Sequence, residues 1–256
     1  MKLIQSRDNP FFKELLKLSA TARSRNKAGL TLLDGAHLLA AYLDAGHQPR
    51  HLLLDAAALR DAEIVSLLAR LEEVPVTQLD DKLFAQLSEL KTPTGILALI
   101  ELPQPVLRAA HFALLLEDIQ DPGNMGSILR TAAAAGCDAV FLSQGCADAW
   151  SPKVLRAAMG GHFCLAIHER QDLLQVARDF SGTLLATSLQ ATRSLYDCDL
   201  GGNIAFLVGN EGAGLSAALL ELATQHVTIP MPGKVESLNA AAATAICLFE
   251  AVRQRI

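Results

Sequence analysis

Residues 204–216 read IAFLVGNEGAGLS, five apolar residues followed at once by a polar loop that holds three glycines. The apolar run has no polar alternation, which is typical of a parallel strand covered on both faces. Similar runs recur through the second half of the chain, separated by stretches with helical spacing. This alternation predicts an α/β domain built on a mostly parallel sheet. Its expected strands are Ala113–Glu117, Ala139–Leu142, Cys164–Ile167, Thr183–Ala186, Ile204–Val208 and Val227–Ile229, and its expected helices are Ser127–Ala135, Pro152–Met159, Asp172–Phe180 and Leu238–Gln254.

The first hundred residues predict a second, smaller α/β domain. Asn9 followed by Pro10 is a helix start, and Phe11, Leu15 and Leu18 then recur at helical spacing. Short apolar runs alternate with helical stretches up to two prolines at 103 and 105, which indicate a stiff linker. We therefore expect domains at 1–102 and 113–256, joined by a linker at 103–112. The expected strands of the smaller domain are Leu30–Leu33, Leu52–Leu54, Val74–Val76 and Ile96–Ile100, with helices at Ala36–Ala45 and Asp61–Leu71.

Composition narrows the class of protein. Of the 256 residues, 51% are hydrophobic and 19% are charged, which supplies apolar surface for packed cores and argues against long disordered tails. No apolar run reaches the length of a membrane span and the chain starts without an apolar signal stretch, so we expect a cytoplasmic protein. The five cysteines are scattered, with no metal-ligand spacing, and are expected to be small buried hydrophobes.

The charge is distributed unevenly along the chain. The net charge is −5, but residues 1–30 carry seven basic side chains against two acidic ones, a net +5 that leaves −10 for the remainder. A basic arm on an acidic body is compatible with docking on RNA, because binding to phosphates needs clustered Lys and Arg. A solvated helix face explains the same residues without any partner. Charge alone leaves both interpretations open.

Three polar loops follow predicted strands, at the edge where open parallel sheets bind ligands. The loop 121–130 holds Asn124, which can hold a ligand, and Arg130, which can reach phosphate, although a proline-glycine turn with a surface arginine is an equal explanation. In the loop 209–216 three glycines allow a backbone to approach a ligand, and Glu211 is either a site residue or a carboxylate at a helix N-terminus. In the loop 229–239, Ser237 and Asn239 are either helix caps or site residues.

The sequence lacks the motifs of several common kinds of nucleotide and metal site. The glycines do not follow the Gly-x-Gly-x-x-Gly order of dinucleotide-binding loops, and the chain has no phosphate loop of the Gly-x-x-x-x-Gly-Lys-Ser/Thr type. The seven histidines show no nucleophile or metal pattern. A nucleotide-dependent enzyme acting on small molecules is therefore a weaker hypothesis.

Taken in order, the three loops resemble the signature motifs of the SpoU (TrmH) family of RNA 2'-O-ribose methyltransferases. The first motif is Asp121-Pro122-x-Asn124-x-Gly126-x-x-x-Arg130, and the second is the loop 209–216. The third combines Ile229-Pro230-Met231, Gly233 and Ser237-Leu238-Asn239. The N-terminal part, with Ser6-x-x-Asn9-Pro10-x-x-Lys13 and Leu33-Asp34-Gly35, resembles the substrate-binding extension of many members, so the resemblance covers nearly the whole chain.

The resemblance implies a parallel sheet with a C-terminal trefoil knot, preceded by a smaller RNA-binding domain. It also implies S-adenosylmethionine as methyl donor, RNA (most directly ribosomal RNA) as substrate, a homodimer, and no metal or membrane. Transfer RNA as substrate, or a catalytically silent RNA-binding protein, are the alternatives. Carried over by motif position, the catalytic residues are Arg130, Asn124, Glu211, Ser237 and Asn239, and the cofactor contacts are Thr187, Gly209, Gly212, Ile229, Met231 and Leu238.

Two positions depart from the family pattern. Asp34 stands where such extensions commonly carry glutamate, and small alanines follow Asn239 where many members alternate valine and serine. The implied chemistry suits the residue types, because a sulfonium methyl is already electrophilic and the protein must mainly align the 2'-hydroxyl and help remove its proton. A guanidinium is a poor base, so Arg130 is easier to explain as a phosphate contact than as the base.

Overall fold

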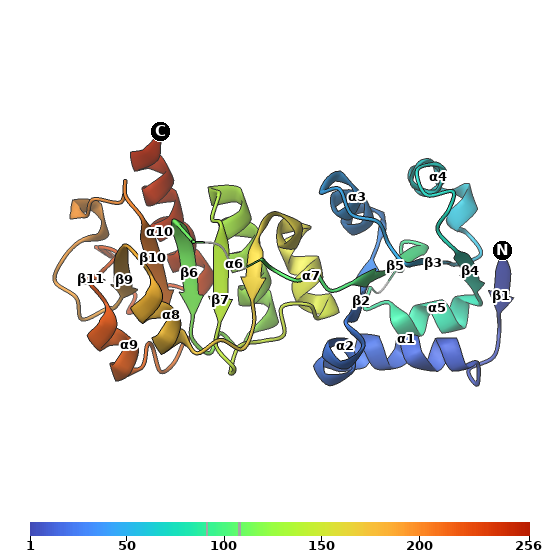
Figure 1. Cartoon of the computed structure of the whole chain (residues 1–256), viewed down its shortest axis with the longest axis horizontal. Coiled ribbons are helices and arrows are strands. Elements are labelled where there is room, and N and C mark those ends of the chain that lie inside the picture. The colour runs from blue at the N-terminus through green and yellow to red at the C-terminus, as the bar shows by residue number, and fades with distance from the viewer. Residues whose placement is uncertain (91, 107–108) are drawn as a thin grey trace. The chain divides into compact units, whose positions relative to one another are not determined.

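The computed structural model describes residues 1–90, 92–106 and 109–256. Its contacts divide the chain into two compact units (Figure 1). The first comprises Met1–Gln104 together with Trp150–Phe163, and the second comprises Pro105–Ala149 and Cys164–Ile256. The predicted second domain contains residues 150–163, whereas the contacts group this segment with the first unit. Residues 107 and 108 of the predicted linker lie outside the described residues.

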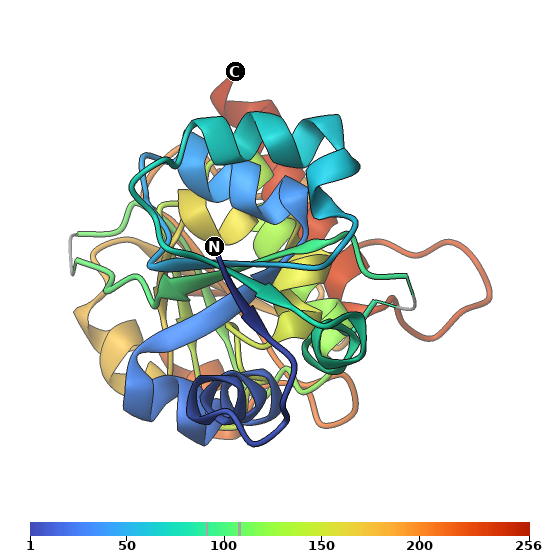
Figure 2. The same ribbon diagram turned by 90° about the vertical axis from the view of Figure 1, so that its right-hand side faces the viewer.

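The first unit is a five-stranded mixed sheet in the order β1-β4-β3-β5-β2. β4 runs parallel to β1 and β3, while β5 is antiparallel to β3 and β2. Figure 2 shows α3 and α4 on one face of this sheet and α1, α2 and α5 on the other. The strands are β1 (Lys2–Ile4), β2 (Leu30–Asp34), β3 (His51–Leu54), β4 (Val76–Leu79) and β5 (Ile96–Glu101), and the helices are α1 (Pro10–Ala20), α2 (Ala22–Ala28), α3 (Ala36–Asp44), α4 (Ala62–Ala69), α5 (Asp81–Leu87) and α7 (Pro152–Ala158), with 3-10 turns η1 (Ala58–Arg60) and η2 (Gly161–Cys164).

Helix α1 begins where the sequence predicts. The Asn9 side chain accepts hydrogen bonds from the backbone N–H groups of Phe11 and Phe12, and Pro10 occupies the first turn. Phe12, Leu15 and Leu18 are buried against α5 and the sheet, whereas Phe11 is only half-buried. The buried face of α1 therefore begins with Phe12, one residue after the predicted Phe11.

The second unit is a parallel sheet of six strands in the order β11-β9-β10-β6-β7-β8. Every residue of β6, β7 and β10 is buried, which confirms the interpretation of the unbroken apolar runs. α8 and α9 pack with one face of the sheet, and α6 packs against α10. The strands are β6 (Phe112–Leu116), β7 (Ala139–Leu142), β8 (Ala166–His168), β9 (Thr183–Thr187), β10 (Ile204–Val208) and β11 (Gln225–Val227), and the helices are α6 (Pro122–Ala135), α8 (Leu173–Asp179), α9 (Ala217–Leu222) and α10 (Ala240–Arg255), with the 3-10 turn η3 (Leu195–Asp197).

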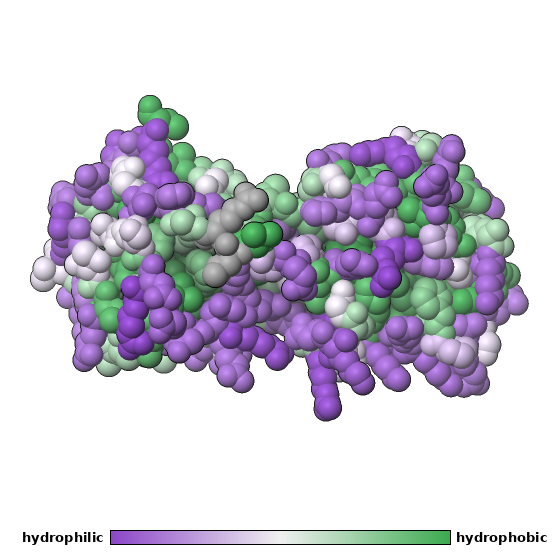
Figure 3. Space-filling model, viewed as in Figure 1, coloured by the Kyte–Doolittle hydropathy of each residue, from purple (hydrophilic) through white to green (hydrophobic). Residues whose placement is uncertain are grey.

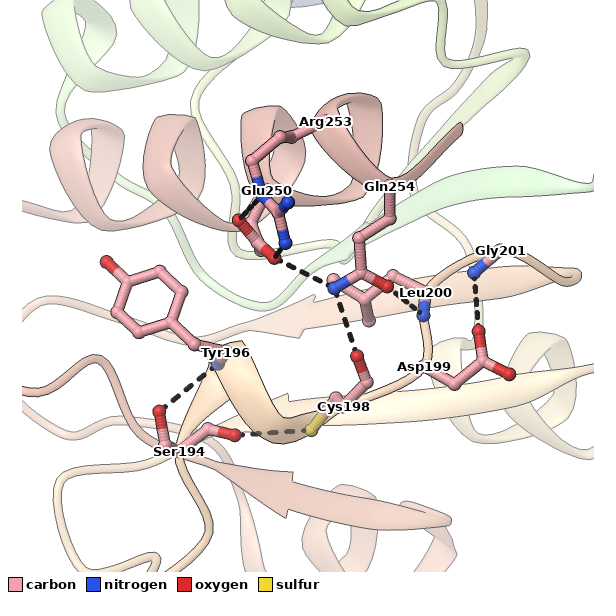
Figure 4. A network of polar contacts seen from close by, with 9 residues as sticks. All are labelled: Ser194, Tyr196, Cys198, Asp199, Leu200, Gly201, Glu250, Arg253 and Gln254. Atoms are coloured by element: carbon pink, nitrogen blue, oxygen red, sulfur yellow. Dashed lines mark hydrogen bonds and ion pairs between the residues drawn. The ribbon is translucent and has the colours of Figure 1, made fainter. Parts of the chain in front are cut away.

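The segment 193–202 ties the end of β11 to α10. Ser194 forms a bridge with Thr228, and Leu195 N–H donates to the Thr228 carbonyl at 2.8 Å. The Gln254 amide, on α10, donates to the Cys198 carbonyl at 3.0 Å and accepts from Leu200 N–H at 2.9 Å (Figure 4). The chain that follows β9 is thus held to two elements that come later in the sequence.

Some predicted elements are misplaced. The predicted strand Val227–Ile229 ends earlier, because Thr228 pairs with residues 193–195 instead of with β9. β4 starts at Val76, not Val74, and β8 starts at Ala166 after a 3-10 turn. All five cysteines are free, but Cys164 is exposed, contrary to the prediction of burial. Across the described ranges, no helix is long and apolar enough to cross a membrane.

Candidate functional site

Three loops meet at the carboxyl edge of the second sheet. They follow β6, β10 and β11, and β6 and β10 are direct neighbours in register. Because all strands are parallel, their carboxyl ends lie on one side. The loops predicted from the sequence therefore share one edge of the sheet.

The first loop is braced by residues that sequence reasoning missed. Asp118 has a left-handed backbone (φ 54°), which is uncommon for a residue other than glycine. Its carboxylate accepts a hydrogen bond from the Ser143 hydroxyl at 2.6 Å, and Ser143 Oγ accepts from Asp118 N–H at 2.9 Å. Asp121 then caps α6 by accepting from Asn124 N–H at 2.7 Å. Asn124 consequently lies in the first turn of α6, because the helix starts five residues before the predicted Ser127.

Asn210 organises the second loop. Its side-chain amide donates to the Asp118 carbonyl at 2.9 Å, and its Oδ1 accepts from Gly212 N–H and Ala213 N–H at 2.9 and 3.0 Å. Glycine is required at 209, because a Cβ there would overlap the backbone of Gly214. The Asn210 side chain thus takes part in three hydrogen bonds, which set the path of this loop and join it to the end of β6.

A directed chain of amides links all three loops. Asn239 Oδ1 caps α10 by accepting from the N–H groups of Ala241 and Ala242 at 2.9 and 3.2 Å. Its Nδ2 therefore faces Asn124 Oδ1, to which it donates at 2.8 Å. Asn124 in turn donates through Nδ2 to Glu211 Oε1 at 2.7 Å. The helix cap thus orients both amides, and Glu211 is left as the acceptor at the end of the chain.

Arg130 and Ser237 are not part of this chain. Arg130 lies on the exposed side of α6 and makes no hydrogen bond or ion pair with any residue that the structure describes. Ser237 is exposed and lines the cavity described next. Of the five predicted catalytic residues, the structure brings Asn124, Glu211 and Asn239 into direct contact.

A cavity of about 420 Å³ opens beside Glu211. This volume falls in the range of small-molecule sites. Its wall is largely apolar, with backbone groups of the loop 209–214 and the Thr187 hydroxyl, which donates to the Leu207 carbonyl at 3.1 Å. All six predicted cofactor contacts line it: Thr187, Gly209, Gly212, Ile229, Met231 and Leu238.

Further lining residues were missed by sequence reasoning. Ser188, Leu189 and Gln190 follow β9, the strand next to β10, and lie outside the three loops predicted from the sequence. The signal was present, because this loop also follows an apolar parallel strand. Within the described part of the chain, no group of three or more His, Cys, Asp or Glu side chains is arranged to hold a metal ion.

The thiol beside the first loop is a donor rather than a nucleophile. Burial raises the pKa of the Cys146 thiol, which donates to the Leu116 carbonyl at 3.2 Å. Its pKa is lowered to a smaller extent by the Ser143 hydrogen bond. Cys146 therefore helps to hold the end of β6 and keeps its proton at neutral pH.

Two protein families match this chain. The SpoU rRNA methylase family matches residues 111–249, and the MRM3-like substrate-binding domain matches residues 9–98. The first match contains the three loops and the cavity. The second contains most of Met1–Gln104, the N-terminal segment of the first unit. Together they cover most of the chain.

Individual relatives match along the whole length. The 23S rRNA (guanosine(2553)-2'-O)-methyltransferase RlmP of Bacillus subtilis is 33% identical, over 97% of this chain and 98% of that protein. The SpoU methyltransferase AviRb of Streptomyces viridochromogenes, solved with the cofactor AdoMet, is 30% identical with a TM-score of 0.84, and the match covers 96% of this chain and 98% of that one. A crystal structure of an RNA 2'-O ribose methyltransferase also has a TM-score of 0.84, at 31% identity, and covers 99% of both chains.

Proposed function

The chain belongs to the SpoU rRNA methylase family, and on that premise we propose that it transfers the methyl group of S-adenosylmethionine to a ribose 2'-hydroxyl of ribosomal RNA. The observation that carries the proposal is the juxtaposition of the 420 Å³ cavity with the hydrogen-bonded chain Asn239–Asn124–Glu211. The choice of ribosomal over transfer RNA is supported by full-length similarity to RlmP.

The cavity suits S-adenosylmethionine chemically. Apolar side chains can cover the adenine ring, and exposed backbone groups of a glycine-rich loop can bond to its polar edge. When bound, the cofactor supplies an electrophilic methyl group on a sulfonium. We assign its binding to Thr187, Gly209, Gly212, Ile229, Met231 and Leu238.

Glu211 is the residue of the set best suited to take the hydroxyl proton. Amides and a guanidinium are not bases at neutral pH, whereas an ionised carboxylate accepts hydrogen bonds and protons. Asn124 holds Oε1 of this carboxylate, and Oε2 has no hydrogen bond to the residues described. Glu211 would then accept the proton of the 2'-hydroxyl, while Asn124 and Asn239 orient it.

Arg130 has a different role in this proposal. Its exposed guanidinium, without a partner among the described residues, suits a phosphate of the bound RNA. Replacing Arg130 with Ala should raise the KM for RNA, whereas replacing Glu211 with Gln should lower kcat at saturating RNA. Full kcat in the Gln variant would remove Glu211 from the proton transfer.

We also infer the wider architecture from the family. The first unit, with its proposed boundary near residue 102, would bind the RNA substrate, and the protein would act in the cytoplasm where ribosomal RNA is processed. A trefoil knot at the C-terminus agrees with the ties from the segment 193–202 to Thr228 and α10. A homodimer agrees with two aromatic side chains, Phe249 on α10 and Tyr196 on η3, which are 48% and 52% exposed.

The proposal is tested by methyl transfer from labelled S-adenosylmethionine to unmodified ribosomal and transfer RNA. We expect label in ribosomal RNA alone. Label in transfer RNA alone would change the substrate, and binding of RNA without transfer would identify a catalytically silent member.

A further inference from the structure

Two consecutive residues that follow β6 anchor the cavity loop 209–216 near both of its ends. Asp118 contributes its backbone carbonyl, which accepts from the Asn210 side-chain amide at 2.9 Å. Glu117 contributes its side chain, because Glu117 Oε2 accepts from Ser216 N–H at 2.7 Å. We refer to these two hydrogen bonds as the β6 anchors. They join the start and the end of the loop to the neighbouring strand.

A fourth loop, which follows β7, fixes Asp118 in turn. The Ser143 hydroxyl donates to the Asp118 carboxylate at 2.6 Å and accepts from Asp118 N–H at 2.9 Å. Gly145 leaves room for that carboxylate, because a Cβ at this position would overlap Asp118 Oδ1. These contacts hold the left-handed backbone of Asp118 (φ 54°). The direction of its carbonyl, and with it the first β6 anchor, therefore depends on Ser143.

Glu117 and Asp118 are placed as internal supports of the fold. Hydrophilic side chains cover much of the surface of both units in the view of Figure 3, whereas these two carboxylates are half-buried. Removing a carboxylate from water is unfavourable unless hydrogen-bond donors replace the water. Ser216 N–H and the Ser143 hydroxyl are such donors. Both carboxylates are therefore committed to holding backbone in place.

The loop that they hold forms one wall of the cavity. Every residue from 209 to 215 lines it, whereas Glu117, Asp118 and Ser143 are absent from the lining among the described residues. Three residues of the loop are glycines, which have the largest conformational freedom to lose when a ligand binds. A loop that is already ordered pays less of this cost, so its order contributes to affinity.

We propose that Glu117, Asp118 and Ser143 are positioning residues for the cofactor, which hold the loop 209–216 in its binding shape without touching the ligand. The inference rests on the proposed function for the identity of the cofactor as S-adenosylmethionine. Loss of either β6 anchor frees the glycine-rich loop. Cofactor affinity then falls because binding must order the loop again.

The test removes one support at a time. E117A removes the acceptor of Ser216 N–H, and S143A removes the hydroxyl that fixes Asp118. E117Q and D118N are the conservative variants, because an amide oxygen can still accept the same hydrogen bond and asparagine tolerates a left-handed backbone.

The matched control lies at the opposite end of β6. Asp138 accepts from the N–H groups of His111 and Phe112 at 2.7 and 3.3 Å, where the strand begins. D138A therefore also removes a carboxylate that holds backbone of the same strand, but it leaves both β6 anchors in place. A purely structural role of Glu117 predicts the same effect on cofactor binding for E117A and D138A.

Three measurements are made on each full-length variant. Calorimetry gives the affinity for S-adenosylmethionine, thermal melting reports on folding, and amide hydrogen exchange of the cofactor-free protein reports on the loop 209–216. We expect E117A and S143A each to weaken cofactor binding by roughly tenfold and to speed exchange in this loop. E117Q and D118N should bind more tightly than the alanine variants, and D138A should affect melting alone.

Several results would overturn the proposal. Wild-type affinity in both alanine variants would do so, as would an equal loss in D138A or an E117Q variant that binds as weakly as E117A. Each alanine variant removes a different support, so if one melts below the titration temperature the other decides the test. If both do, E117D replaces them, since its carboxylate is one methylene further from Ser216 N–H.

Hydrogen exchange separates this inference from the proposed function, because it needs no cofactor. A wild-type protein that binds no S-adenosylmethionine would contradict the proposed function. In that case faster exchange in E117A and S143A, but not in D138A, would still support the β6 anchors. Unchanged exchange in both alanine variants would overturn them, whatever the cavity binds.

Discussion

Replacing Asn239 with Asp removes one donor from the amide chain and leaves the helix cap in place. Aspartate caps a helix as well as asparagine, so Ala241 and Ala242 keep their acceptor. The new carboxylate faces Asn124 Oδ1, which now lacks a donor. Either Asn124 stays and loses this bond, or its amide turns and presents its oxygen to Glu211.

The magnitude follows from the bond that is lost. If the Asn124 amide turns, its hydrogen bond to the Glu211 carboxylate is lost, and a hydrogen bond to a charged group contributes about 1.5–3 kcal/mol. If this energy stabilises the transition state and not the bound ground state, its loss lowers kcat by roughly 10- to 150-fold. Stability should change little, whereas Asn239→Ala loses the cap as well and should cost about 1 kcal/mol of folding free energy.

The assay is kcat at saturating RNA and cofactor, together with thermal melting, for the Asp and Ala variants. We expect the Asp variant to melt close to the wild type and to be slow. A wild-type kcat in the Asp variant would refute the orienting role of the chain, and an early melting transition with normal kcat in the Ala variant would show that Asn239 acts only as a cap.

Three further predictions concern other parts of the second unit. Asn210→Ala removes the bonds that shape the loop 209–214, so calorimetry should show a loss of S-adenosylmethionine affinity of roughly 5- to 30-fold; unchanged affinity would contradict the role of this side chain. A hydrogen bond from Arg253 and, to a smaller extent, one from Gln254 lower the pKa of Glu250 from 4.5 to about 2. The ionised carboxylate therefore stabilises the fold above pH 4.5, and this stabilisation is lost as the pH falls towards 2. Glu250→Gln should therefore lower the melting temperature at pH 7 and have little effect near pH 2, and an equal shift at both would contradict the assignment. Phe249→Asp places a charge on the exposed aromatic of α10 and should give a monomer by light scattering, whereas an unchanged dimer would move the proposed interface elsewhere.

The sequence was most informative where burial decides the structure. Ile204–Val208 and Ala139–Leu142 are buried on both faces, and their apolar runs match the observed strands to the residue. β1 escaped prediction because Lys2–Ile4 is a three-residue edge strand with one buried side chain. Helix α2 escaped because its one buried side chain is Arg25, so it has no apolar periodicity.

The site was predictable as a set of loops but not as a set of contacts. The glycines and polar residues of the loop 209–216 predict a ligand site from the sequence alone. The role of Asn210 depends on a carbonyl 92 residues away, at Asp118, and no local pattern encodes that contact. The grouping of Trp150–Phe163 with the first unit has the same origin, since the hydrogen bond from Thr31 Oγ1 to the Trp150 carbonyl spans 119 residues.

Methylation of the ribose 2'-oxygen can be tested by locating the transferred methyl group in the RNA. The protein is incubated with methyl-labelled S-adenosylmethionine and unmodified ribosomal RNA, and the RNA is then hydrolysed with alkali, which cannot cleave next to a methylated 2'-oxygen. We expect the label to remain in a single alkali-resistant dinucleotide. Label recovered in mononucleotides or on a base would contradict it.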